Sequence, residues 1–249
     1  YYEIAGKFKS LPCPFITITG CAVSFFAHHL AEIYVIYGFS FLLLGCILLL
    51  QPREDQVLVF APYLWLIGLF GLLHGLKELF DWWQLAYQPE HPVVPWLDNL
   101  LLFISYLPLF EFGRRIGGHF RPTSVNHTIN PYLPVSLYVI AGLGLILTSI
   151  FASQLHSGLD AGIRLFIGLP GAVFTGLGLL RYLRIHHHIL IRMRAERALR
   201  VAIVAFIAYG LLTSLVTIND PRLNLLLPSH SLFLELTGVP VQLLRALSA

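Results

Sequence analysis

Charged residues are scarce in this chain. Of its 249 residues only 12% are charged and 57% are hydrophobic, whereas a soluble globular domain typically has about 25% charged residues. Together with a mean hydropathy of +0.75, this scarcity excludes the soluble classes of protein. The net charge of +3 is too small to indicate a nucleic-acid partner.

Cysteine is also scarce, and familiar catalytic motifs are missing. Cys13, Cys21 and Cys46 have no metal-ligand spacing and form no even set for disulfides. The sequence contains no Walker loop, nucleophile elbow, dinucleotide fingerprint, zinc-protease motif, or kinase or cyclase signature. We therefore assign no catalytic residue and no cofactor. A secretory signal is missing as well, and we expect the natural protein to continue beyond Ala249.

Long apolar runs are what the sequence does contain. A membrane-spanning helix needs about 20 apolar residues, and these runs are continuous rather than alternating, which argues against a β-barrel. A seventh run begins near Gly238, after six others: Tyr34–Leu50, Val57–Phe80, Val93–Phe112, Leu133–Phe151, Ile163–Leu180 and Val201–Ile218. We predict an all-α polytopic membrane bundle of about seven transmembrane helices, forming one domain over residues 34–249.

The first 33 residues form a separate N-terminal segment. Within it, Phe15–Leu30 is apolar but short. We favour a surface-lying or re-entrant segment here, and an extra short span is the alternative.

Arginine placement predicts the orientation of the bundle. The loop 181–200, RYLRIHHHILIRMRAERALR, contains six arginines and one glutamate, and the loop 113–132 contains three arginines. Both loops lie on one side if the helices alternate, and the positive-inside rule places that side in the cytoplasm. We predict a multi-pass membrane protein with the loops 113–132 and 181–200 in the cytoplasm, the loop 219–236 outside and position 190 inaccessible from outside.

The stretch GLLHGLKELFDWW, residues 71–83, contains the most informative side chains. His74, Glu78 and Asp81 share one helix face. Ionisable groups at membrane depth are costly and usually face a cavity or a partner. We therefore predict a ligand-binding cavity in the outer half of the bundle, and we expect Glu78 or Asp98 to pair with Arg164 or Lys77. Its candidate residues are His74, Lys77, Glu78, Asp81, Asp98 and Arg164. An equally strong alternative is a salt-bridge network that only fixes helix packing.

Three further patterns have simpler interpretations. Glu111 is spaced to pair with Arg114 or Arg115 at the inner interface. The run His186–His188 lies among arginines, whose charge opposes cation binding, so no metal site is assigned. Six glycines of the fourth and fifth runs are interpreted as helix-packing positions: Gly142, Gly144, Gly168, Gly171, Gly176 and Gly178.

Several short motifs resemble those of a known family. They are HGLKELFDWW at 74–83, FEFGRR at 110–115, RLFIGLPGA at 164–172 and LTGVPVQLLRAL at 236–247. In this order they resemble the N-terminal multi-helix membrane sensor region of bacterial histidine kinases, PAS-containing sensors and diguanylate cyclases, over residues 34–249. The resemblance implies that the protein lies in the bacterial inner membrane and that the last helix leads to a cytoplasmic output domain of a signal-transduction or two-component system.

The favoured hypothesis is therefore a membrane-embedded signal-sensing module. A small molecule or a proton would act on the outer half of the bundle, and the sensor would work as a homodimer in the lipid bilayer. One alternative is an accessory or structural subunit of a larger membrane complex. Another is a haem or redox protein with His74 and His28 or His29 as axial ligands. A transporter is the fourth hypothesis, although no internal repeat supports it.

Overall fold

The computed structural model describes residues 26, 28–51, 60–119, 136–215, 220–225, 230–237 and 239–248. Every regular element in these ranges is a helix. The long helices are α3 (Leu30–Leu50), α4 (Leu64–Tyr87, after the 3₁₀ turn η1, Ala61–Tyr63), α5 (Val94–His119), α6 (Ser136–Phe151) and α10 (Glu196–Leu215). A continuous rod consists of α7 (Leu155–Ile163), the π-helical turn η2 (Arg164–Gly168) and α8 (Leu169–Ile185). Short elements complete the fold: α9 (His187–Arg192), η3 (Leu223–Leu225), α11 (His230–Thr237) and α12 (Val241–Ser248).

Four of these helical segments are long and apolar enough to cross a membrane: Leu30–Leu50, Ala61–Tyr87, Leu155–Ile185 and Glu196–Ser214. The predicted all-α architecture with membrane-compatible helices is confirmed at this level. The third and fourth predicted runs coincide with α5 and α6. However, α5 carries four charged residues and α6 has only 16 residues. A count of seven spans stays a prediction, and the segment Phe15–Leu30 lies almost entirely outside the described residues.

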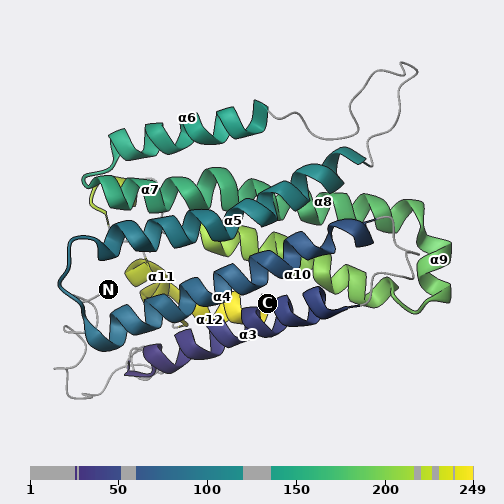
Figure 1. Ribbon diagram of the computed structural model, residues 1–249, viewed down its shortest axis with the longest axis horizontal. Coiled ribbons are helices and arrows are strands. Elements are labelled where there is room, and N and C mark those ends of the chain that lie inside the picture. The colour runs from purple at the N-terminus through teal and green to yellow at the C-terminus, as the bar shows by residue number, and fades with distance from the viewer. Residues whose placement is uncertain are drawn as a thin grey trace.

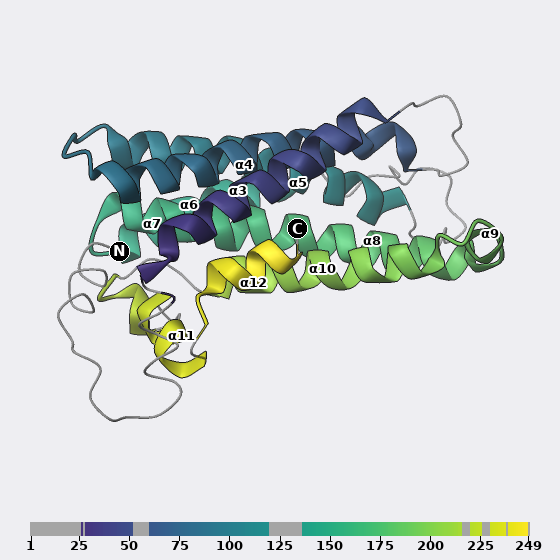
Figure 2. The same cartoon turned by 90° about the horizontal axis from the view of Figure 1, so that it is seen from below.

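The long helices lie side by side along one axis (Figure 1). In the bundle α5 packs against both α4 and α8, α10 packs against α8, and α6 packs at the edge against α7 and η2. The short helix α12 contacts both α3 and α10. Figure 2 shows α9, which lies within the arginine-rich segment 181–200, at one end of the bundle and α11 at the opposite end. The loop 181–200 and the end of α5 therefore lie at the same end.

Glycine allows α3 and α4 to touch through their backbones. A Cβ atom on Gly71 would lie 2.8 Å from both the amide nitrogen of Gly45 and the carbonyl oxygen of Phe41. One on Gly75 would lie 2.7 Å from the carbonyl oxygen of Gly38. Such close approach is typical of membrane helices whose interfaces contain small residues.

The packing role predicted for the six glycines of helices four and five is confirmed for several but was wrong for one. A Cβ on Gly144 would overlap the ring of Phe166, at 2.4 Å. One on Gly171 would lie 2.8 Å from the Phe110 backbone. A Cβ on Gly142, in contrast, would meet no atom of another described element within 4 Å, so this residue makes no close helix contact in the part of the chain that the structure describes.

The π-helical turn η2 positions Arg164 inside the bundle. Leu169 donates its backbone N–H to the carbonyl of Arg164 rather than to that of Leu165, and Pro170, which has no N–H to donate, follows directly. The Arg164 carbonyl also accepts a hydrogen bond of 2.8 Å from the Ser214 hydroxyl. This bond ties the turn to α10.

Asp220 fastens the segment before η3 to the turn between α6 and α7. Its carboxylate accepts hydrogen bonds from the backbone N–H of Ser153 at 3.1 Å, of Arg222 at 3.0 Å and of Leu223 at 3.2 Å. Although burial opposes ionisation, the hydrogen bonds from Ser153 and from these backbone N–H groups hold the pKa of Asp220 below its ordinary value. The carboxylate therefore acts as an acceptor that brings two distant parts of the chain together.

Candidate functional site

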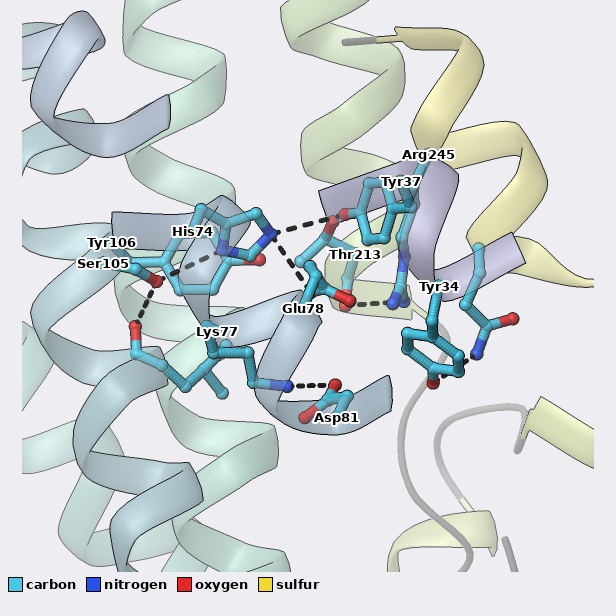
Figure 3. A network of polar contacts seen from close by, with 12 residues as sticks. Tyr34, Tyr37, His74, Lys77, Glu78, Asp81, Ser105, Tyr106, Thr213 and Arg245 are labelled. Carbon is cyan, nitrogen blue, oxygen red and sulfur yellow. Dashed lines mark hydrogen bonds and ion pairs between the residues drawn. The ribbon is translucent and has the colours of Figure 1, made fainter. Parts of the chain in front are cut away.

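His74 lies at the centre of a buried polar cluster. It is fully buried on α4, and the rings of Phe70 and Phe41 lie 5.2 and 4.9 Å from its own, centre to centre. Figure 3 shows the imidazole surrounded by polar side chains that come from several helices. A buried histidine enclosed by aromatic rings must find its hydrogen-bond partners within the protein.

Both ring nitrogens of His74 have such partners. Nε2 lies 2.7 Å from the hydroxyl of Tyr209 on α10 and 3.3 Å from the hydroxyl of Tyr37 on α3. Nδ1 lies 3.2 Å from the hydroxyl of Ser105 on α5. The Tyr209 hydroxyl in turn lies 3.0 Å from that of Tyr106, also on α5. The cluster thus joins α3, α4, α5 and α10.

The Ser105 hydroxyl determines which tautomer of His74 is present. It donates its proton to the carbonyl of Leu102 at 2.8 Å, so towards the imidazole it can only accept. Nδ1 of His74 must therefore carry a proton. In the neutral ring Nε2 is then an acceptor, and Tyr209 donates to it. Tyr106, for its part, donates to Tyr209.

Glu78 lies one helical turn further along the same face as His74. Its Oε1 is 3.4 Å from Nε2 of His74, and both side chains are almost completely buried. The predicted adjacency of these two residues is confirmed. Three cationic side chains lie near this pair: Lys77, Arg164 and Arg245, the last of which belongs to α12.

Arg245 connects α12 to the cluster and to the end of α10. Its guanidinium donates to the carbonyl oxygens of Leu212 at 2.9 Å and Thr213 at 3.4 Å. One turn earlier on α12, Gln242 donates to the Tyr34 hydroxyl of α3 at 3.1 Å. Because α10 ends at Leu215, Arg245 supplies a positive charge where the carbonyl groups of a helix end are otherwise unpaired.

Lys77, Asp81 and Asp98 form a second charged group at the outer rim of the cluster. Lys77 Nζ lies 2.5 Å from Asp81 Oδ2 and 3.7 Å from Asp98 Oδ1. Gln84 donates to Asp98 at 3.1 Å. The prediction that Glu78 or Asp98 would pair with Lys77 or Arg164 is confirmed by the contact between Lys77 and Asp98.

Arg164 has a partner that we did not predict from the sequence. Its Nε donates to both carboxylate oxygens of Asp160, at 2.9 and 3.0 Å, and both residues are buried. Asp160 lies one turn before Arg164 on α7, so its spacing of four residues was the available signal. The other contributors that sequence reasoning missed are Tyr37, Ser105, Tyr106, Tyr209 and Arg245.

At the other end of the bundle, the predicted pairing of Glu111 is confirmed. Its carboxylate accepts hydrogen bonds from Arg114 at 2.7 Å, Arg115 at 2.5 Å and the hydroxyl of Tyr138 at 2.6 Å. The Tyr138 bond joins α5 to α6. Here the charged group acts as a connection between helices at the end of the bundle.

A cavity of about 240 Å³ lies between α3, α4, α5, α8 and α10. Its lining is apolar apart from Tyr209, with Phe41 and Phe70 separating it from His74 and with Leu64, Leu179 and Phe206 further along. None of the predicted residues His74, Glu78 and Asp98 lines this cavity. The predicted polar residues instead face one another.

The other histidines form no metal site within the part of the chain that the structure describes, which contains no group of three or more metal-ligating side chains. His29 lies 3.6 Å from Glu32, and His187 lies 3.6 Å from Glu196. His74 already has protein partners at both nitrogens. The hypothesis of a haem or redox protein stays a prediction.

Comparison with known proteins gives no family assignment: no family model matches the sequence, and neither the curated proteins nor the solved structures contain a significant match.

Proposed function

We propose that this chain is a membrane-embedded signal-sensing module, in which the cluster around His74 responds to a stimulus and α12 transmits the response. The single observation that carries the proposal is the position of Arg245. This residue belongs to α12, yet it is buried beside Glu78 and binds the last carbonyls of α10. A change in the charge or hydrogen bonding of the cluster therefore acts directly on α12.

The proposed direction of transmission is from the outer half of the bundle towards the cytoplasm. The rim formed by Lys77, Asp81 and Asp98 lies close to the turn between α4 and α5, opposite the end that holds α9 (Figure 2). The arginines of α9 and its neighbours favour the cytoplasmic side. In this proposal the protein is a multi-pass protein of the bacterial inner membrane, and α12 leads towards a cytoplasmic output domain.

The position of α12 relative to α10 provides the test of coupling. Spin labels at Val201→Cys and Leu247→Cys, both at exposed positions, report the distance between the two helices in lipid nanodiscs after the native cysteines are replaced. Glu78→Gln removes a charge next to Arg245, and we expect it to shift the distance distribution. A ligand can shift an equilibrium only between states that differ in such contacts.

The control for this experiment is Glu111→Gln, which neutralises a carboxylate at the far end of the bundle. We expect it to leave the distance between the labels unchanged. His74→Asn serves as a second cluster variant if Glu78→Gln does not fold. An unchanged distance in the folded cluster variants would contradict the proposed role of α12.

The orientation is tested by cysteine accessibility. Position 190, inside the predicted cytoplasmic loop, is unsuitable because Leu190 is buried, whereas Met193 is exposed. We expect Met193→Cys to be protected from an impermeant thiol reagent in intact cells, and Glu90→Cys, in the turn between α4 and α5, to be labelled. The reverse pattern would show that the topology is inverted.

A further inference from the structure

The contact between His74 and Glu78 is unfavourable while neither group holds a proton at the contact. Because Ser105 keeps the proton of the neutral ring on Nδ1, Nε2 is an acceptor, and its single lone pair receives the hydrogen bond of Tyr209 at 2.7 Å. The Oε1 atom of an ionised Glu78 lies 3.4 Å from the same nitrogen, as a buried charge without a hydrogen bond from His74. A proton on Nε2 gives this carboxylate an opposite charge at close range.

The balance of charges in the surrounding cluster also indicates that the cluster binds one proton. The cations of the cluster are Lys77, Arg164 and Arg245, and its carboxylates are Glu78, Asp81, Asp98 and Asp160. With a neutral His74, the carboxylates exceed the cations by one. An uncompensated charge inside a membrane-spanning bundle is costly, and one additional proton balances the cluster.

We propose that His74 and Glu78 form a proton-binding site, in which Nε2 of His74 takes up one proton and the carboxylate of Glu78, 3.4 Å away, balances its charge, and that release of this proton reverses the hydrogen bonds of Tyr209 and Tyr106. This inference rests on the proposed sensing function and identifies the stimulus as a proton.

The reversal follows from the number of protons that each group can donate. When Nε2 holds the proton it no longer accepts from Tyr209, whose hydroxyl proton then turns to the oxygen of Tyr106. When the proton leaves, Tyr209 donates to Nε2 at 2.7 Å and accepts from Tyr106 at 3.0 Å. Since Tyr106 lies on α5 and Tyr209 on α10, the protonation state of the pair changes the contact between two helices.

Charged and titratable groups face the pair from all the elements that surround it. Lys77, Arg164 and Arg245 place positive charge around the pair, and the Glu78 carboxylate lies 3.4 Å from Nε2. The facing groups are Tyr37 of α3, Lys77 and Glu78 of α4, Asp98 and Tyr106 of α5, Arg164 of η2, Tyr209 of α10 and Arg245 of α12. Glu78 is the carboxylate that lies against the imidazole, so the proton depends on this residue.

The test is a pH titration of the full chain in lipid nanodiscs with ¹⁵N-labelled histidine. The nitrogen chemical shifts of His74, identified by their loss in His74→Gln, report Nδ1 and Nε2 separately. We expect Nδ1 to stay protonated throughout, while Nε2 gains a proton as the pH falls. Glu78→Gln should move this uptake to lower pH by about one unit or more, which is at least a tenfold loss of proton affinity.

Tyr209→Phe should have the opposite effect. It removes the hydroxyl that stabilises the unprotonated Nε2, so uptake should move to higher pH. Tyr34→Phe is the matched control, because the Tyr34 hydroxyl binds Gln242 rather than His74, and it should leave the titration unchanged. Opposite shifts in the two cluster variants are not expected from a residue that only fills space.

Two results would overturn the inference. One is a wild-type His74 whose Nε2 never changes protonation over the pH range in which the protein is folded. The other is a shift in the same direction for Glu78→Gln and Tyr209→Phe. The titration measures only the protonation of His74, whereas the spin labels measure the proposed coupling to α12. A negative result in one experiment therefore leaves the other proposal standing.

Discussion

Asp160→Asn is expected to destabilise the protein by about 3 to 5 kcal/mol, because it leaves the buried guanidinium of Arg164 without its counter-charge. Both side chains are inaccessible to solvent, and Arg164 Nε bonds to both oxygens of the carboxylate. The measurement is the free energy of unfolding in mixed micelles, from titration with a denaturing detergent. An unchanged midpoint would show that Arg164 finds another partner.

Two further variants separate the loss of the pair from a loss of packing. The double variant Asp160→Leu with Arg164→Met replaces the pair by apolar groups and should recover most of the lost stability. Glu196→Gln breaks the pair with Arg200, whose side chain is 63% exposed. This exposed pair should contribute less than about 1 kcal/mol.

Gly71→Ala is expected to cost about 1 to 3 kcal/mol, the usual range for an overpacked interface. The new methyl group would lie within 2.9 Å of backbone atoms of α3 on several sides. Backbone cannot move aside as a flexible side chain does, so α3 and α4 must separate. The same unfolding titration measures the loss.

Gly142→Ala provides the matched control for this effect. It makes the same change within a helix, but no other element among the described residues has an atom within 4 Å of the added methyl group. Since alanine has the higher helix propensity, this variant should be neutral or more stable by up to about 1 kcal/mol. Equal destabilisation by the two substitutions would show that the contact between α3 and α4 is not what makes Gly71 necessary.

Patterns within one helix were predictable from the sequence. A spacing of four residues placed His74 beside Glu78, and spacings of three and four placed Glu111 beside Arg114 and Arg115. The apolar runs likewise predicted the helices, because a continuous apolar stretch of this length is typical of a membrane-spanning helix. These predictions needed no knowledge of how the helices are arranged.

Contacts between helices were not predictable in the same way. Tyr37 and Tyr209 lie in apolar runs, where a tyrosine is ordinarily an aromatic core residue, and only the fold brings their hydroxyls to His74. The fifth run was expected to begin at Ile163, because polar residues precede it. The helix begins at Leu155 instead. Asp160 lowers the hydropathy of this stretch of sequence, but in the bundle its charge is paired with that of Arg164, so it can be buried within the helix.

The glycine contacts between α3 and α4 have a mechanical consequence. Where two helices meet backbone against backbone, fewer side-chain rotamers lie at the contact than in ordinary helix packing, so we expect the pair to resist sliding and rolling over each other. Gly38, Gly45, Gly71 and Gly75 are spread along the interface, so we expect α3 and α4 to move together as one rigid unit. The short helix α12 contacts both α3 and α10. We therefore expect a displacement of α12 to be accompanied by movement of α10 relative to a fixed pair of α3 and α4.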